Sequence, residues 1–258
     1  MARSRDSIAN TLTVAIGVSL VCSILVSSAA VVLRPVQDRN EVLFRQTIVL
    51  QVAGLYEPGI DVADRFSTIE ARMVDLETGE FVDDADVAAY DAQAAANDPD
   101  RSVAIPADED IAGIKRRAEL VPVYLIRDGE QLEQIILPVY GKGLWSTMYG
   151  YLSLEADGNT VRGLRFYEHA ETPGLGDQID RESWRALWPG KRIKDEQGKL
   201  RIEVVRGSPA SPDDYQVDGL SGATLTGRGV SNLVRYWTGD HGFGPFLKKL
   251  SAREASNG

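Results

Sequence analysis

The residues best suited to chemistry lie in the segment 218–226, which reads Asp-Gly-Leu-Ser-Gly-Ala-Thr-Leu-Thr. Its small residues and hydroxyls lead into a stretch with helical spacing, and the first turn of a helix carries unpaired N–H groups that attract a phosphate. Gly222 and Ala223 let another molecule approach the backbone closely. The segment predicts either a phosphate site or a turn in which Thr224 or Thr226 caps the helix. Taken alone, the residue types favour the cap.

Composition limits the chemistry that the rest of the chain can support. With 258 residues there is room for one sizeable domain plus an anchor, or for two small domains. The net charge of −10 argues against a nucleic-acid partner, because little here would neutralise a phosphate backbone. One cysteine, Cys22, and two histidines, His169 and His241, are too few for a disulfide framework, a zinc cluster or a cysteine-ligated iron–sulfur centre within the chain.

The N-terminal part has the composition of a membrane anchor. Residues 8–33 contain no charged residue, and a helix of this length spans about 39 Å, against about 30 Å for a hydrocarbon core. A cleaved signal peptide, ending near Ser28-Ala29-Ala30, is the alternative. Val21 is too large for the position before a lipoprotein cysteine. The length favours an uncleaved transmembrane helix that ends at Pro35.

Charge next to the anchor bears on its orientation. Arg3 and Arg5 precede it, whereas Arg34 and Arg39 follow it together with acidic residues. This bias weakly favours a cytoplasmic N-terminus for residues 1–7 and a soluble part outside the cytoplasm.

Residues 34–120 read as a helical region with an insertion rich in Asp and Ala. Apolar spacing predicts a helix over 40–55, which Gly54 and Pro58-Gly59 end, and a second, shorter helix over 60–75. The stretch 83–110 has few large apolar residues, so we expect a loosely ordered surface excursion there.

Residues 121–258 predict a domain built from hairpins. Strand-like runs over 121–126 and 134–140 are joined across Asp128-Gly129, and runs over 149–155 and 161–167 across Asp157-Gly158-Asn159. We expect a short helix over 182–187, a strand over 200–205, a loop over 209–212 and a last helix over 226–237. The pattern is typical of an α+β domain with a mostly antiparallel sheet flanked by helices. Because no G-x-G-x-x-G motif opens a helix, a Rossmann domain that binds NADH is not expected.

Several motifs in a fixed order resemble a known family. The segment 218–224 matches the flavinylation signature of FMN-binding domains, Asp-Gly-Leu-Ser-Gly-Ala-Thr. With the anchor, Gly-Lys-Gly-Leu-Trp-Ser at 141–146, Glu-Thr-Pro-Gly-Leu-Gly at 171–176 and Gly-Phe-Gly-Pro-Phe-Leu at 242–247, nearly the whole chain resembles the NqrC family of the sodium-translocating NADH:quinone oxidoreductases.

The resemblance implies a covalent FMN, esterified through its phosphate to Thr224. Thr226 remains a chemically possible acceptor, and Gly227-Arg228 stands where the family has Ser-Asn, so Arg228 is a candidate to face the phosphate. The cofactor-binding set that follows comprises Ser221, Gly222, Ala223, Thr224, Leu225, Thr226, Leu144, Trp145, Ser146, Glu171, Thr172, Leu175 and Gly176.

Within this set the resemblance suggests individual roles. Leu144 and Trp145 are candidates to pack against the flavin ring and Ser146 to make a polar contact, while Glu171 and Thr172 are candidates to hydrogen-bond the flavin or its ribityl chain. By residue type alone, Trp145 would be a core aromatic and Glu171 a solvated residue in a plain turn. His169 is expected to be structural.

The resemblance also implies partners and a cellular location. The partners are the other subunits of a complex in the bacterial inner membrane and a flavin transferase that uses FAD and magnesium. The FMN domain is expected on the periplasmic side of that membrane. Electrons would arrive from an iron–sulfur centre in other subunits and pass to a second covalent FMN, while NADH oxidation and ubiquinone reduction drive sodium export. No catalytic side chain is expected in this translocase subunit.

Two other interpretations stay open. One is the G-type subunit of the related ferredoxin–NAD oxidoreductase complex, which shares the flavinylation motif. The other is an anchored, non-enzymatic binding module in which 221–226 is only a capped turn. The segment 242–247 either folds back onto the core or docks on a neighbouring protein of the complex.

Overall fold

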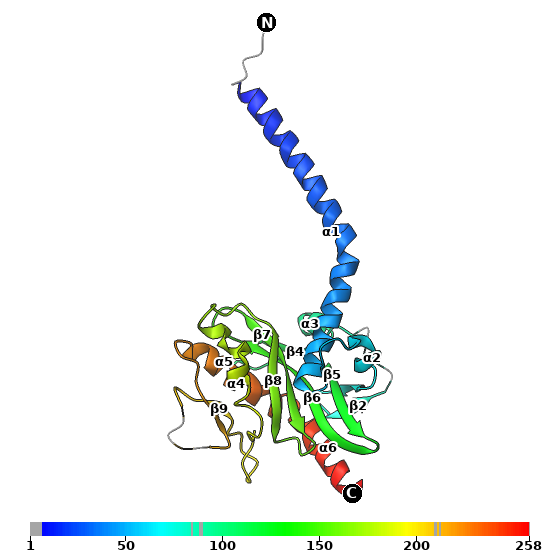
Figure 1. Ribbon diagram of the computed structural model, residues 1–258, viewed down its shortest axis with the longest axis vertical. Coiled ribbons are helices and arrows are strands. Elements are labelled where there is room, and N and C mark those ends of the chain that lie inside the picture. The colour runs from blue at the N-terminus through cyan, green and yellow to red at the C-terminus, as the bar shows by residue number, and fades with distance from the viewer. Residues whose placement is uncertain (1–6, 84, 88–89, 209–210, 212, 258) are drawn as a thin grey trace. The chain divides into compact units, whose positions relative to one another are not determined.

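The computed structural model describes the chain except residues 1–6, 84, 88–89, 209–210, 212 and 258. It divides into two compact units, residues 1–45 and 46–258. The described residues of the first unit lie almost entirely in α1 (Ile8–Val52), which continues into the second unit. This helix is long and apolar enough to cross a membrane (Figure 1). Its apolar side chains between Ile8 and Val36 are exposed. The predicted end at Pro35 is wrong, because α1 continues through it. One proline removes a single N–H donor, and the turns on either side still hold the helix.

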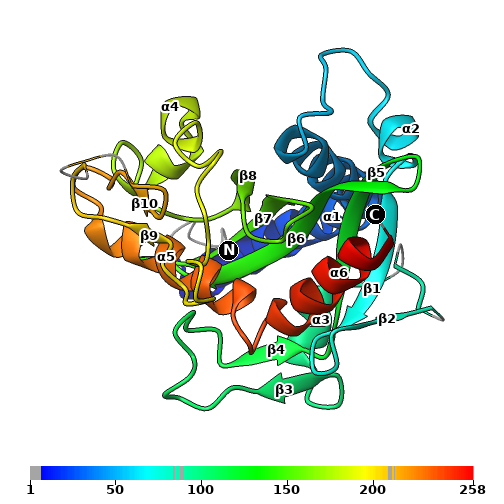
Figure 2. The same cartoon turned by 90° about the horizontal axis from the view of Figure 1, so that it is seen from below.

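The second unit contains a six-stranded sheet in the order β2-β1-β5-β6-β7-β8, with every neighbouring pair antiparallel. Figure 2 shows the sheet strands in cyan and green. The α+β prediction is confirmed. The strands are β1 (Glu70–Asp75), β2 (Glu80–Val82), β5 (Leu120–Asp128), β6 (Gln131–Lys142), β7 (Thr147–Glu155) and β8 (Val161–Glu168).

The two predicted hairpins are confirmed. The β5–β6 turn places Gly129 at a φ of +60°, and the β7–β8 turn places Gly158 at +67°, a region that L-residues with a side chain rarely adopt. In the second turn, the Asp157 carboxylate accepts hydrogen bonds from the backbone N–H groups of Asn159 and Thr160, both at 2.8 Å.

The prediction of a helical region over 34–120 is wrong in two places. Only α2 (Val62–Phe66) forms within 60–75, and β1 follows it and pairs with β5, some fifty residues later. The stretch 83–110, expected to be loose, contains α3 (Ala92–Asn97) and β3 (Ser102–Ala104), which pairs with β4 (Arg116–Ala118). Ala95 and Ala96 are buried in the core. Small side chains allow this close packing without large apolar residues.

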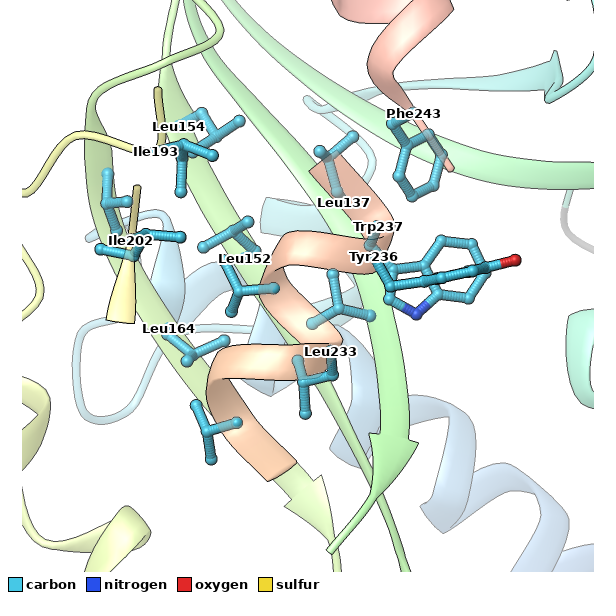
Figure 3. Packing of buried hydrophobic residues seen from close by; sticks show 14 of the residues in the cluster. Leu137, Leu152, Leu154, Leu164, Ile193, Ile202, Leu233, Tyr236, Trp237 and Phe243 are labelled. Carbon is cyan, nitrogen blue, oxygen red and sulfur yellow. The ribbon is translucent and has the colours of Figure 1, made fainter. Parts of the chain in front are cut away.

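The main core lies between one face of the sheet and α5 (Thr224–Thr238). Figure 3 shows side chains of the sheet, among them Leu137, Leu152 and Leu164, meeting Leu233 and Trp237 of this helix. The Trp237 indole N–H donates to the carbonyl of Tyr140 at 2.6 Å. The other face of the sheet packs against the last turns of α1 through a second cluster of Ile48, Val49, Leu50, Val52, Ala53, Ile69, Ile136 and Tyr151.

Short elements and a terminal helix complete the domain. They are η1 (Gly176–Asp180), α4 (Glu182–Arg185), β9 (Glu203–Val204), β10 (Gln216–Val217) and α6 (Gly244–Asn257). The predicted strand over 200–205 shrinks to β9, which pairs in parallel with β10, and part of the predicted loop at 209–212 lies outside the described residues. Helix α5 begins two residues before its predicted start.

The segment 242–247 folds back onto the core and opens a helix that the sequence pattern did not predict. Phe243, Phe246 and Leu247 are buried, and Phe246 meets Phe81 edge to face with ring centroids 5.3 Å apart. Glycine and proline at the start obscured the helix, although proline in a first helical turn removes no intrahelical bond.

We expect Phe246→Ala to destabilise the second unit by about 3–5 kcal/mol, because it leaves a cavity in the core. Urea unfolding of the detergent-solubilised chain, followed by tryptophan fluorescence, measures the change. Lys248→Ala, an exposed position on the same helix, serves as the control. Equal stability of the two variants would contradict the packing of α6.

Candidate functional site

Three loops meet at the start of α5: residues 143–146 between β6 and β7, residues 169–176 after β8, and residues 218–223 before the helix. Glycines allow this approach. A Cβ at Gly176 would come within 2.9 Å of the Thr226 hydroxyl oxygen, and one at Gly222 within 2.9 Å of Leu175. The segments that the sequence singled out, far apart along the chain, therefore form one site.

The Glu171 carboxylate joins these loops. Its side chain is only 4% exposed. Oε1 accepts a hydrogen bond from the backbone N–H of Trp145 at 3.1 Å, and Oε2 accepts one from the Thr226 hydroxyl. The interpretation of Glu171 as a solvated residue in a plain turn is wrong, because this carboxylate links one loop to another and to α5.

The two threonines of the segment have different environments. Thr224 is exposed at the first residue of α5, whereas Thr226 is fully buried and donates its hydroxyl to Glu171. The residue before the helix, Ala223, makes no side-chain cap hydrogen bond. The prediction that Thr224 or Thr226 caps the helix is therefore wrong. The first-turn N–H groups lack a side-chain cap, and the accessible hydroxyl beside them belongs to Thr224.

Four exposed apolar side chains lie on the site loops and on the first turn of α5. Trp145 is 65% exposed, so the interpretation of this residue as a core aromatic is wrong. Leu144, Leu175 and Leu225 are each at least 40% exposed, and the four residues come from the loops 143–146 and 169–176 and from the first turn of α5. We call Leu144, Trp145, Leu175 and Leu225 the apolar patch. Clustered exposed apolar residues on a soluble domain commonly mark a binding surface.

Several polar side chains hold the loops in place. The Trp145 indole N–H donates to the Thr172 hydroxyl at 2.9 Å. The Ser146 hydroxyl accepts a hydrogen bond from the backbone N–H of Ala170 at 2.8 Å, so it already bridges two loops. The Gln178 amide donates to the Leu175 carbonyl at 2.8 Å and to the Ser221 carbonyl at 3.3 Å. Sequence reasoning missed Gln178, because no local motif signals a bond across 43 positions.

His169 fixes the backbone of the loop that contains Glu171. Its Nδ1 accepts from the Glu171 backbone N–H at 3.2 Å, and its Nε2 lies 2.7 Å from an Asp180 carboxylate oxygen. The hydrogen bond to Asp180 raises the pKa of His169 above its ordinary value, in opposition to partial burial. These contacts agree with a structural role.

A cleft of about 390 Å³ has Thr224 in its lining and contains none of the residues of the apolar patch. Polar residues of α5, including Thr224, Arg228 and Ser231, line one wall, and residues 203–207 with Gly219 and Leu220 line the other. The sequence motif singled out Arg228 but gave no sign of Arg206, which lines the opposite wall.

Known proteins show which family has this arrangement. The model of the FMN-binding domain matches residues 143–239, which include all three loops. NqrC of the Na(+)-translocating NADH-quinone reductase of Yersinia pestis is 47% identical, with 99% of this chain and 98% of that protein covered, and its counterpart in Pseudomonas aeruginosa is 48% identical, with 98% and 99% covered. This chain belongs to the NqrC family.

Solved structures of this family have the same fold. NqrC of Shewanella oneidensis superposes with a TM-score of 0.76 at 37% identity, over 84% of this chain and 99% of that one. The corresponding reductase subunit from Parabacteroides distasonis gives a TM-score of 0.65 at 28% identity, over 83% and 96%. The resemblance to this family is confirmed, and the chain is a subunit of an oxidoreductase complex with an FMN-binding domain.

We expect Glu171→Ala to destabilise the domain by about 2–4 kcal/mol, since it leaves the buried Thr226 hydroxyl and the Trp145 N–H without their acceptor. Thermal unfolding measures this loss. Glu168→Ala removes an exposed carboxylate three residues earlier and is the control. If both variants unfold at the same temperature, the Glu171 carboxylate does not hold the loops in place.

We expect Asp180→Asn to lower the pKa of His169 relative to the unsubstituted chain, because the carboxylate that favours the charged imidazole is removed. NMR titration of the imidazole protons reports it, with His241 as the internal control. A folded-state pKa above the unfolded value contributes stability that is present at low pH and lost as pH rises through the folded pKa. The stability that the chain loses above about pH 6.5 should therefore be smaller in Asp180→Asn than in the unsubstituted chain. A pKa unmoved by the substitution would contradict the pairing.

Proposed function

We propose that the chain carries FMN covalently on Thr224 and transfers electrons within a membrane NADH–quinone reductase that exports sodium. The observation that carries this proposal is the exposed Thr224 hydroxyl at the uncapped start of α5, beside the apolar patch. Membership in the NqrC family supports the respiratory role, since the relatives are named for sodium translocation and NADH–quinone reduction.

The residues present fit FMN at both of its ends. The flavin ring is a large, flat, mostly apolar group, and the apolar patch offers Trp145 and three leucines for it to cover. The phosphate is anionic, and the N–H groups of the first turn of α5 favour an anion. Ser221, Gly222 and Ala223 form the turn between these two features, where the backbone at Gly222 has a φ of +75°.

Attachment needs only the hydroxyl of Thr224 from this chain. In a transfer from FAD, the Thr224 oxygen forms a bond to the FMN phosphorus, the P–O bond to the AMP phosphate breaks, and AMP leaves with the electron pair while the hydroxyl proton passes to water. A flavin transferase with magnesium would supply the catalytic groups. Thr226 is a poor acceptor, because its hydroxyl is buried and engaged by Glu171.

The chain's own side chains then position the cofactor. When bound, FMN supplies the electron-accepting and electron-donating chemistry. Glu171 holds Trp145 and Thr226 in place, Thr172 orients the Trp145 ring through the indole N–H, and Gln178 ties Leu175 to the turn at Ser221. A fixed pocket keeps the distance and orientation between redox partners constant, which favours electron transfer over side reactions.

Helix α1 fits a single span of a bacterial inner membrane. The positive residues Arg3 and Arg5 favour an N-terminus in the cytoplasm. The FMN domain would then lie on the periplasmic side, where a covalent bond prevents loss of the cofactor. The other subunits of the complex supply the iron–sulfur centre and the second flavin.

We expect Thr224→Val to abolish covalent flavin in a chain made together with the transferase, because valine keeps the shape of threonine without the hydroxyl. In-gel flavin fluorescence after denaturation and peptide mass spectrometry measure it. Thr226→Val is the matched control and should retain FMN on the peptide that contains Thr224. Flavin still bound to the first variant, or an unsubstituted chain of unmodified mass, would refute the ester at Thr224.

A further inference from the structure

The cleft beside Thr224 is positively charged, although the chain as a whole has a net charge of −10. Three arginines line it, Arg206, Arg228 and Arg235, against a single carboxylate, Glu203. Glu203 lies 3.5 Å from Arg235, and the Arg235 Nε donates to the Ile202 carbonyl at 2.6 Å. Arg235 is therefore already engaged, and two cations remain.

Neither of these two cations has a partner within the described part of the chain. Among the described residues, the side chains of Arg206 and Arg228 take part in no hydrogen bond or ion pair, and both residues are exposed. Unpaired guanidinium groups in one cleft attract an anion, and their planar fork suits the oxygens of a phosphate.

Arg228 lies on the same face of α5 as Thr224. The two residues are four apart, a spacing that places side chains next to each other on a helix. Helical side chains also lean toward the N-terminus, so that of Arg228 extends toward Thr224 and the first-turn N–H groups. Both residues line the same cleft.

Arg206 lies on the opposite wall, in a backbone held on both sides. The N–H of Val205 donates to the Val217 carbonyl at 2.9 Å, and the Gly207 carbonyl accepts from the N–H of Gly219 at 2.6 Å. A Cβ at Gly219 would come within 2.1 Å of the Val205 carbonyl oxygen, so glycine is required for this approach. The wall that carries Arg206 is thus fastened to the segment that leads into Thr224.

We infer that Arg206 and Arg228 form a two-sided clamp for the phosphate diester that links FMN to Thr224. The clamp rests on the proposed function. It assigns the phosphate to the cleft and the flavin ring to the apolar patch, so that Thr224 stands where the two meet. A diester carries one negative charge shared by its two non-bridging oxygens, and each arginine can donate hydrogen bonds to one of these oxygens.

Phosphorus NMR of the detergent-solubilised, flavinylated chain tests the clamp without reference to activity. Arg228→Ala and Arg206→Ala should each move the diester resonance toward its position in the denatured chain, and the double variant should move it further. Arg228→Lys should give an intermediate shift, because it keeps the charge without the fork. Arg201→Ala is the matched control, since this exposed arginine lines a neighbouring cleft and pairs with Asp195, and it should leave the resonance in place.

The outcomes separate the two proposals. Intact mass shows whether FMN is attached, so an unmodified wild-type chain would refute the ester itself. With FMN attached, a diester resonance that is the same in the wild type and in both alanine variants would overturn the clamp. Initial rates of flavin transfer from FAD by the purified transferase complete the test. Slower transfer with an unmoved resonance would assign the arginines to docking of the transferase and would also overturn the clamp.

Discussion

One buried carboxylate holds the site together. Glu171 accepts from the backbone of the 143–146 loop and from the hydroxyl of Thr226 on α5, and its own loop follows β8. Burying a carboxylate is costly unless its oxygens are hydrogen-bonded, so the loops that supply these bonds are held in one arrangement. Gly143 and Gly176 make the approach possible, since a Cβ at either would come within 3.0 Å of the Glu171 side chain.

In this arrangement Thr224 and Thr226, two residues apart, have different environments. Thr226 donates its hydroxyl to Glu171 and is buried, whereas Thr224 is exposed and its hydroxyl bonds to no residue in the described part of the chain. The helix start has no side-chain cap, so its N–H groups remain available to an anion. The site also has two kinds of surface, because the apolar patch and the arginine-lined cleft that contains Thr224 share no residue. An amphipathic cofactor with a flat ring and an anionic tail matches that division.

The rigidity of this region comes from the packing behind it. Helix α5 buries Val230, Leu233, Val234 and Trp237 against the sheet, and the Trp237 indole is bonded to the backbone of β6, the strand that leads into the 143–146 loop. The loop and the helix start are therefore anchored to the same core. Helix α6 covers that core through Phe246, and Phe243 just before it is buried there too. The segment 242–247 therefore packs onto its own domain, in place of docking on a neighbouring protein of the complex.

The sequence by itself determined the two hairpins, helix α5, the apolar N-terminal helix and the residues of the three loops. These depend on local rules: alternation, helical spacing, and glycine at turns such as Gly129 and Gly158. Tertiary structure alone decided what depends on pairing across long separations. β1 has no strand signal strong enough to outweigh a helical interpretation, and it becomes a strand because β5 supplies its partner. The difference between Thr224 and Thr226, the bond of Gln178 to Ser221 and the place of Arg206 likewise follow from contacts between segments that are distant in sequence, which no local pattern encodes.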